Sequence, residues 1–184
     1  SFKVGGNLGF LTHDEKFLNG KSLLKKIESG QFSIQKRMML EAHLNVHSNS
    51  KVLREKETLL ALNDFYFRSN VDEVSPTCTL EVQIDGESVD TYRGDGLILS
   101  SPTGSTAYAM ATGGPILHQD IDAIVVSAIC PMSLSSRPIV IPSSSKISVK
   151  PTESMTKKVR LWHDGVSSSI LSPGEHCLIN KSKH

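Results

Sequence analysis

The chain has 184 residues, with 20 basic and 19 acidic side chains and a formal net charge of +1. This length allows a substantial core, and so small a net charge excludes a strong field that would attract nucleic acid or an anionic membrane surface. Its three cysteines form no Cys-x-x-Cys pair, which is typical of a reduced intracellular protein. No apolar run reaches the roughly 20 residues that span a bilayer, so we expect a soluble, cytoplasmic protein; an organelle, after removal of a transit peptide, is the alternative.

The beginning of the chain predicts a connector followed by one domain. Residues 1–15 contain Gly5-Gly6-Asn7, which has too little side chain to anchor a strand, so we expect them to be the end of an upstream domain. The domain itself is expected over residues 16–184. Within it, residues 22–28 have apolar side chains at helical spacing, with Ser22 placed as a cap and Gly30 placed to end the helix.

After this helix the hydrophobic period changes to two, which predicts a mainly β fold. Apolar and polar residues alternate over residues 38–47, as in a strand with one buried face. The Asp85-Gly86 pair between two alternating runs predicts a tight hairpin turn. The expected strands are residues 38–47, 59–68, 78–84, 87–92, 123–129, 138–141, 147–150, 159–162 and 176–179. Many short strands with a few short helices predict a mainly β (α+β) fold built from antiparallel strands.

Residues 94–118 carry the strongest functional signal. They begin Gly-Asp-Gly-Leu-Ile-Leu-Ser-Ser-Pro-Thr-Gly-Ser-Thr-Ala-Tyr, an apolar strand that runs into a hydroxyl-rich turn and the start of a helix. Backbone N–H groups without partners at a helix start, together with the helix dipole, favour a polar or phosphorylated ligand. The local pattern therefore predicts a nucleotide site.

The same stretch closely resembles the NAD kinase family. That family has Gly-Asp-Gly, a short apolar strand, Ser-Thr-Pro-Thr-Gly-Ser-Thr-Ala-Tyr and Gly-Gly-Pro-Ile-x-His in this order, and only Ser101 stands where the family often has Thr. Further family segments follow in register over nearly the whole chain: Asn-Leu-Gly-Phe-Leu-Thr (7–12), Ala-Leu-Asn-Asp (61–64), Ile-Cys-Pro (129–131), Ser-Leu-Ser-Ser-Arg-Pro (133–138) and Trp-His-Asp-Gly (162–165). The resemblance implies the family's β-rich carboxy-terminal domain, which normally follows an α/β nucleotide-binding domain.

The resemblance also implies which residues bind the dinucleotide. They are Phe10, Asn63, Asp64, Arg93, Asp95, Thr103, Thr106, Ala107, Tyr108, Ala111 and Cys130. Three departures from the family pattern affect this site: Asp64 replaces a Glu, Ala111 replaces a common Ser, and Met132 replaces a common His. We expect the role of Asn63, whose amide can meet both a donor and an acceptor on adenine, to be retained more securely than that of Asp64.

Taken without the resemblance, several of these residues have plainer interpretations. The Gly-Asp-Gly around Asp95 fits a simple hairpin turn, and the Asn63-Asp64 pair fits the end of a strand. Cys130 fits a buried structural thiol. Asp164 fits a turn residue first, and a site residue only by analogy with the family.

The reaction implied by the resemblance is transfer of the γ-phosphoryl group of ATP to the 2′-hydroxyl of the adenosine ribose of NAD, giving NADP. Such a transfer needs positioning and a divalent metal such as Mg²⁺ with the ATP. In the family it depends on a Gly-Gly-Asp-Gly loop of the upstream domain, and these 184 residues do not contain that sequence. We therefore name no catalytic residue and no metal ligand in the chain, and its activity by itself stays open.

Two functions from different classes remain. The first is an NAD kinase of which this is the larger part, and the second is a stand-alone NAD(H)-binding or oligomerisation module without kinase activity. A related lipid-kinase group shares the two-domain plan, but the Ser-Pro-Thr-Gly-Ser-Thr-Ala-Tyr string argues against it. The expected partners are NAD, ATP and further copies of the chain in a homo-oligomer, with no nucleic acid and no membrane.

Overall fold

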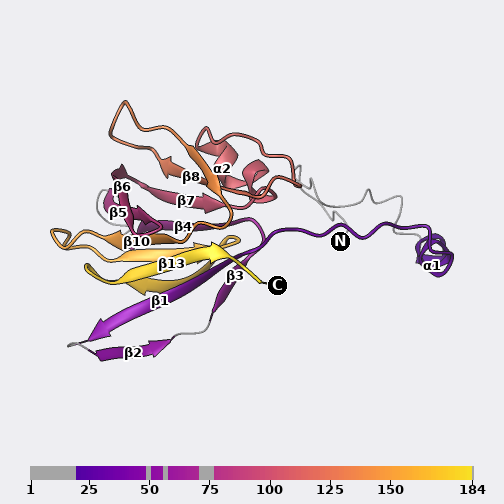
Figure 1. Ribbon diagram of the computed structural model, residues 1–184, viewed down its shortest axis with the longest axis horizontal. Helices are drawn as coiled ribbons and strands as arrows, with labels where there is room; N and C mark the ends of the chain where they lie inside the picture. The colour runs from indigo at the N-terminus through magenta and orange to yellow at the C-terminus, as the bar shows by residue number, and fades with distance from the viewer. Residues whose placement is uncertain (1–19, 49–50, 56–57, 71–76, 184) are drawn as a thin grey trace. The chain divides into compact units, whose positions relative to one another are not determined.

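The computed structural model describes residues 20–48, 51–55, 58–70 and 77–183, and the chain divides into two compact units, 1–36 and 37–184 (Figure 1). In the first unit the helix α1 (Gly20–Glu28) carries Lys25 in its last turn, where a cation faces the negative end of the helix dipole. Gly30 follows at φ +68°, as predicted. The helix begins two residues before Ser22, so the prediction of Ser22 as its cap is wrong. The predicted connector, 1–15, lies outside the described residues.

The second unit consists of two sheets whose neighbouring strands are antiparallel (Figure 1). The seven-stranded sheet has the order β2-β1-β13-β10-β5-β6, with β3 paired to β1. Its strands are β1 (Leu40–Ser48), β2 (Lys51–Glu55), β3 (Leu59–Ala61), β5 (Cys78–Ile84), β6 (Glu87–Gly94), β10 (Ile147–Pro151) and β13 (His176–Lys181). The six-stranded sheet has the order β12-β11-β4-β7-β8-β9. Its strands are β4 (Asp64–Ser69), β7 (Gly96–Ser100), β8 (Ala123–Ile129), β9 (Ile139–Pro142), β11 (Val159–His163) and β12 (Val166–Leu171). The predicted mainly β fold of antiparallel strands is confirmed.

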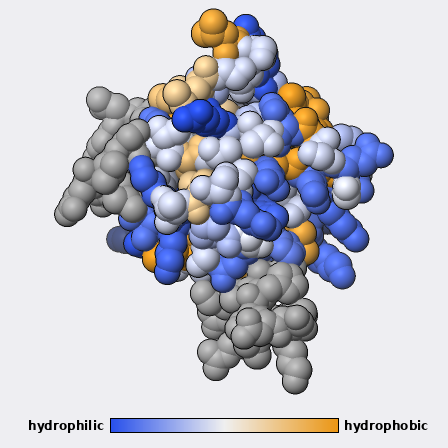
Figure 2. All heavy atoms as spheres, turned by 90° about the vertical axis from the view of Figure 1, so that its left-hand side faces the viewer, coloured by the Kyte–Doolittle hydropathy of each residue, from blue (hydrophilic) through white to orange (hydrophobic). Residues whose placement is uncertain are grey.

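The two sheets bury one core between them. Alternate side chains supply it: Leu40, Ala42 and Leu44 on β1, which is the face that the alternation predicts, and Phe65 and Phe67 on β4. Each large side chain that is buried here contributes about 1.5 to 3 kcal/mol to the stability of the fold. Figure 2 shows one face of the molecule, where hydrophilic residues predominate and apolar residues form small patches. No helix in the described part of the chain is long and apolar enough to cross a membrane.

Most predicted strands are confirmed, and two were missed. The strands β5 and β8 have the predicted bounds, and Asp85 (φ +54°) and Gly86 (φ +88°) form the predicted turn between β5 and β6. The missed strands are β2, which is rich in charged residues, and β12, whose run of serines reads as a turn. In both cases pairing with a neighbouring strand outweighs a weak local preference.

The prediction of one strand over residues 59–68 is wrong. The chain bends at Leu62 and Asn63, and the bend separates β3 from β4, which belong to different sheets. Asp64 therefore begins a strand instead of ending one. Residues 62 and 63 connect the two sheets, and Asp64, which follows them, pairs with Ser100 at the end of β7. The sequence predicts the nucleotide site at this end of β7.

Candidate functional site

The hydroxyl-rich segment forms a compact loop, residues 101–108, at the end of β7. It contains the 3₁₀ helix η2 (Gly104–Thr106) and runs into the short helix α2 (Tyr108–Ala111). The Ser105 hydroxyl donates to a carbonyl of the loop at 2.6 Å and accepts the N–H of Leu117 at 3.0 Å. Donor and acceptor of this buried hydroxyl therefore both hold the loop in shape.

The loop rests directly on the bend. The Ser101 hydroxyl donates to the Leu62 carbonyl at 2.6 Å, and the Ser101 N–H donates to the Asn63 carbonyl at 2.9 Å. Gly104 lies so close to Asn63 that a Cβ atom on it would overlap the Asn63 backbone. Only glycine fits at this contact, so the bend and the loop form one packed unit.

The bend is held by the carboxylate of Asp164, in the turn between β11 and β12. Its Oδ2 accepts the N–H of Leu62 at 2.8 Å, and its Oδ1 accepts the N–H groups of Asn63 at 2.7 Å and Asp64 at 3.2 Å. Asp164 (φ +45°) and Gly165 (φ +81°) form the turn that their sequence suggests. The backbone donors at the bend are thereby satisfied by one side chain.

The side chain of Asp64 is buried beside the bend and is only 3% exposed. Burial, followed by the negative charge of Asp164, raises the pKa of its carboxyl from 3.8 to about 6. The backbone N–H of Tyr108 donates to this carboxylate and acts in the opposite direction. Because Tyr108 is the first residue of α2, a side chain of the protein already occupies the helix start that the sequence pattern assigns to a phosphorylated ligand.

Three aromatic rings lie together beside the loop, on the face of the six-stranded sheet that points away from the core. Tyr66 on β4 stacks on Trp162 on β11, with ring centroids 5.7 Å apart and planes 6° apart. Tyr108 meets Tyr66 edge-on, at 5.1 Å and 86°. Burial, and after it the charge of Asp64, raises the pKa of the Tyr66 hydroxyl. All three rings are partly exposed, so they offer a surface on which a planar ligand could stack.

Three further predicted residues lie at the opposite end of β7. The Asp95 N–H donates to the Ile129 carbonyl at 2.9 Å, and the Arg93 carbonyl accepts the Met132 N–H at 2.8 Å. Cys130 has φ +44° and an exposed side chain, so its interpretation as a buried structural thiol is wrong. At about 3.3 Å per residue, this end is about 20 Å from the beginning of the loop.

The predicted site residues thus form two groups. The first group lies at the bend and along the loop and α2: Asn63, Asp64, Thr103, Thr106, Ala107, Tyr108 and Ala111. The second group, at the other end of β7, is Arg93, Asp95 and Cys130. Phe10 lies outside the described residues.

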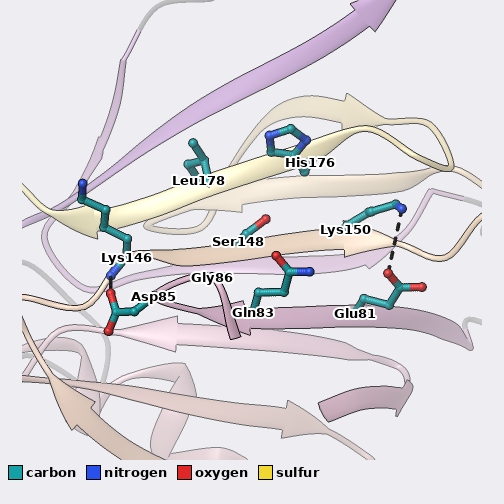
Figure 3. Close-up of a pocket in the computed structure, with 9 residues that line it drawn as sticks. All are labelled: Glu81, Gln83, Asp85, Gly86, Lys146, Ser148, Lys150, His176 and Leu178. Carbon is teal, nitrogen blue, oxygen red and sulfur yellow. Dashed lines mark hydrogen bonds and ion pairs between the residues drawn. The ribbon is translucent and has the colours of Figure 1, made fainter. Parts of the chain in front are cut away.

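A separate groove of about 620 Å³ crosses the seven-stranded sheet (Figure 3). Its lining is Glu81, Gln83, Asp85, Gly86, Lys146, Ser148, Lys150, His176 and Leu178. None of these residues belongs to the predicted site, and Lys150 is paired with Glu81 at 3.9 Å and with Glu153 at 3.2 Å. In the described residues, no three His, Cys, Asp or Glu side chains are grouped so as to hold a metal ion. The bend and the loop therefore remain the candidate site.

Known proteins share both the sequence and the fold of this chain. The profile of the ATP-NAD kinase C-terminal domain matches residues 63–184, which is more than half of the chain. The chain belongs to the ATP-NAD kinase family. Among its relatives, an NAD kinase 1 of Prochlorococcus marinus is 56% identical over 185 residues, and NAD kinase 1 of Parasynechococcus marenigrum is 48% identical over 196 residues.

These alignments include 100% of this chain but 60% and 62% of the two relatives, so the chain spans about three fifths of their length. Yeast NADH kinase, solved in complex with NADH, superposes with a TM-score of 0.82 at 32% identity and covers 96% of this chain and 49% of that protein. An NAD kinase of Archaeoglobus fulgidus, solved in complex with ATP, gives a TM-score of 0.72 over 95% of this chain and 61% of that protein. At 24% identity the second likeness concerns the fold alone.

The sequence of this ATP-NAD kinase family member did not identify Tyr66 and Trp162 as site residues. It also did not predict that Asp164 holds the bend. Tyr66 lies between two buried phenylalanines, so the alternation alone places it on the opposite face of the sheet, and Trp162 alternates in the same way with the buried Leu161. Asp164 gives no such local signal for its contacts, because its partners are 100 to 102 residues away.

Proposed function

We propose that this chain is the dinucleotide-binding part of an NAD kinase. The whole protein then transfers the γ-phosphoryl group of ATP to the 2′-hydroxyl of the adenosine ribose of NAD, giving NADP. The observation that supports this proposal is the packed unit of bend and loop beside three partly exposed aromatic rings. The profile of the ATP-NAD kinase C-terminal domain matches the residues from Asn63 onwards, and the relatives named above are NAD kinases.

The two groups of site residues offer different kinds of contact to NAD. At the bend, the Asn63 amide offers both a donor and an acceptor to a base or a ribose, and Tyr108 offers a ring face and a hydroxyl. At the other end of β7, the partly exposed carboxylate of Asp95 can accept a hydrogen bond from a ribose hydroxyl or an amide. We propose that NAD contacts both ends, either along the sheet of one chain or across two copies in a homo-oligomer. The exposed Met132 and Leu134 offer apolar surface for such a second copy.

The chain's own residues bind and orient the acceptor in this proposal. ATP is proposed as the donor, and Mg²⁺ as the ion that accompanies its phosphates and neutralises charge there. In the described residues no three His, Cys, Asp or Glu side chains are grouped so as to hold a metal ion, and the two acidic side chains at the bend already accept backbone N–H groups. No ligand of Mg²⁺ and no catalytic residue is therefore proposed in this chain, and a cytoplasmic location stays a prediction.

A binding module without kinase activity is the second candidate, because these 184 residues contain no Gly-Gly-Asp-Gly loop. The two candidates differ in one measurement, the formation of NADP from NAD, ATP and Mg²⁺. We expect the chain to bind NAD in isothermal titration calorimetry but to form NADP only in a protein that also carries such a loop. Robust NADP formation by the 184-residue chain alone would contradict this division of labour, and absence of NAD binding would contradict the proposed function.

Asp95 provides a sharper test of binding. Asp95→Asn should weaken NAD binding by about tenfold through loss of a charged acceptor, while the melting temperature of the protein stays nearly unchanged. Asp90→Asn is the matched control, because Asp90 is an exposed acid on β6 whose carboxylate contacts the N–H of the adjacent Thr91 at 2.7 Å. Equal NAD affinity in folded Asp95→Asn and Asp90→Asn proteins would remove Asp95 from the site.

A further inference from the structure

The carboxylate of Asp164 makes contacts that differ from those of a ligand-binding side chain. Both of its oxygens accept backbone N–H groups, at 2.7, 2.8 and 3.2 Å, and all three donors come from consecutive residues of the bend. In return, the Asp164 N–H donates to the Asp64 carbonyl at 3.1 Å. Hydrogen bonds to a charged acceptor are stronger than those between neutral groups, so this turn holds the bend firmly.

The bend in turn carries the group of site residues at this end of β7. The carbonyl groups of Leu62 and Asn63 accept the hydroxyl and the N–H of Ser101, which begins the loop. The Asp64 carboxylate accepts the N–H of Tyr108, which begins α2. A displacement of the bend would therefore move the Asn63 amide, the loop and the Tyr108 ring together.

The chain contains a second turn of the same kind, at Asp85 and Gly86 on the other sheet. Asp85 also has a positive φ, its Oδ1 accepts the N–H of Lys146 at 2.8 Å, and its own N–H donates to the Lys146 carbonyl at 2.9 Å. This turn holds one backbone N–H and belongs to the other sheet, whereas Asp164 holds three N–H groups of the bend itself. Substitutions at Asp85 and at Asp164 can therefore be compared. A change seen at both turns is a general effect on stability, and a change seen only at Asp164 is an effect on the site.

We propose that Asp164 is a positioning residue for dinucleotide binding: its carboxylate fixes the bend, and through the bend it places Asn63 and Tyr108 against the ligand without touching the ligand itself. This inference rests on the proposed function, because it takes the dinucleotide as the ligand of the site. By analogy with the family, Asp164 would be a residue of the site itself. The proposal instead makes it a residue that supports the site without contacting the ligand.

The test compares Asp164→Asn with Asp85→Asn, the same substitution in the matched turn. An asparagine at position 164 turns its NH₂ group toward a backbone N–H, so at least one of the three hydrogen bonds is lost. We expect NAD affinity, measured by isothermal titration calorimetry below the melting transition, to fall by about tenfold or more in Asp164→Asn and to change less than about twofold in Asp85→Asn. Ser101→Ala, which removes the hydrogen bond from the loop to the Leu62 carbonyl, keeps the test available if Asp164→Asn does not fold; it should weaken NAD binding in the same direction.

A second readout does not depend on NAD. In ¹H–¹⁵N NMR spectra of the unliganded protein, the amide resonances of residues 62–64 and 101–108 should shift or broaden in Asp164→Asn, and they should stay in place in Asp85→Asn. The pKa of Asp64, followed by NMR, should also fall in Asp164→Asn because a neighbouring negative charge is gone.

The outcomes are distinct. If the wild-type chain binds NAD and the two variants bind it equally well, or if the loop resonances do not change in Asp164→Asn, the positioning role is wrong. If the wild-type chain does not bind NAD while the loop resonances move as expected, the proposed function fails but Asp164 still positions the loop. Weaker binding together with displaced loop resonances, in Asp164→Asn alone, supports both proposals.

Discussion

Asp64 and Asp164, 100 residues apart in the sequence, exchange two hydrogen bonds. The N–H of Asp64 donates to Oδ1 of Asp164 at 3.2 Å, and the N–H of Asp164 donates to the Asp64 carbonyl at 3.1 Å. The exchange brings two carboxyl groups close together, and for this reason the charge of Asp164 adds to the effect of burial on the pKa of Asp64. Burial and the neighbouring charge of Asp164 therefore oppose ionisation of Asp64, whereas the hydrogen bond from the Tyr108 N–H favours it.

Asp64→Asn should change how the stability of the protein depends on pH. The pKa of Asp64 is about 6 in the folded protein and near 3.8 when unfolded, so the folded state binds the proton more tightly. The contribution of Asp64 to stability is then greatest below about pH 4 and falls as the pH rises through 6, by up to about 3 kcal/mol. Asparagine carries no charge and can still accept the Tyr108 N–H, so the variant should be more stable than wild type at pH 7 and equal to it near pH 4. Thermal melts across this range measure the difference.

Asp85→Asn is the control for this experiment, since Asp85 is exposed and lies on the other sheet. It gives the effect of the same substitution at a site away from the buried carboxyl pair. A difference between Asp64→Asn and wild type that is the same at every pH would show that Asp64 titrates as an ordinary carboxyl group.

Gly104→Ala should destabilise the protein through the contact with Asn63. The added Cβ atom would overlap the Asn63 backbone, which can yield only if the bend and the loop move apart. We expect a loss of at least about 2 kcal/mol in urea unfolding, and weaker NAD binding in the protein that remains folded. Gly113→Ala is the comparison: Gly113 has φ +78° and open space around it, so only backbone strain of about 1 kcal/mol should appear. Equal losses in the two variants would contradict close packing at Gly104.

The stack of Tyr66 on Trp162 gives the site an optical signal, because Trp162 is the only tryptophan in the chain. Tyr66→Leu removes the ring that contacts both Trp162 and Tyr108, so the emission of Trp162 should change and stability should fall by about 1 to 2 kcal/mol. Tyr66→Phe keeps the ring, so its emission and stability should stay close to those of wild type. If Tyr66→Leu leaves both the emission spectrum and the unfolding curve unchanged, the rings are not stacked in solution.

The three cysteines should differ sharply in reactivity. Cys130 is exposed, whereas burial raises the pKa of Cys78 to about 11 and raises the pKa of Cys177 as well. Titration of the native protein with a thiol reagent at pH 8 should therefore label one cysteine, and titration in denaturant should label three. Cys130→Ser should abolish labelling of the native protein, and fast labelling that persists in this variant would contradict the burial of the other two thiols.

The sequence predicts those parts of the fold that depend on near neighbours. The alternation around Leu40, Ala42 and Leu44 identifies the buried face of β1, and the Asp85-Gly86 pair identifies its turn, because both follow from the geometry of a few adjacent residues. The division of residues 59–68 into two strands has no local cause. It depends on Asp164, which supplies the acceptors that make the bend possible.

The candidate site, too, could be predicted only in part from the sequence. The family motifs led to Asn63 and to Tyr108, and the structure brings both onto one packed unit. In the hydroxyl-rich turn the resemblance assigns Thr103 and Thr106 to the ligand, whereas Ser101 and Ser105 use their hydroxyl groups to hold the loop. Residue types alone do not distinguish a hydroxyl that binds a ligand from one that fixes the backbone, because both uses need the same donor.

The dependence of the bend on Asp164 also constrains the order in which the protein folds. Residues 62–64 are synthesised about a hundred residues before the side chain that satisfies their N–H groups, and contacts of such long sequence separation form slowly. The nascent chain therefore cannot complete this region until the hairpin of β11 and β12 has emerged from the ribosome. A chain released before residue 164 would contain every loop motif from 94 to 118. It would still lack the carboxylate that accepts the N–H groups of the bend on which the loop packs.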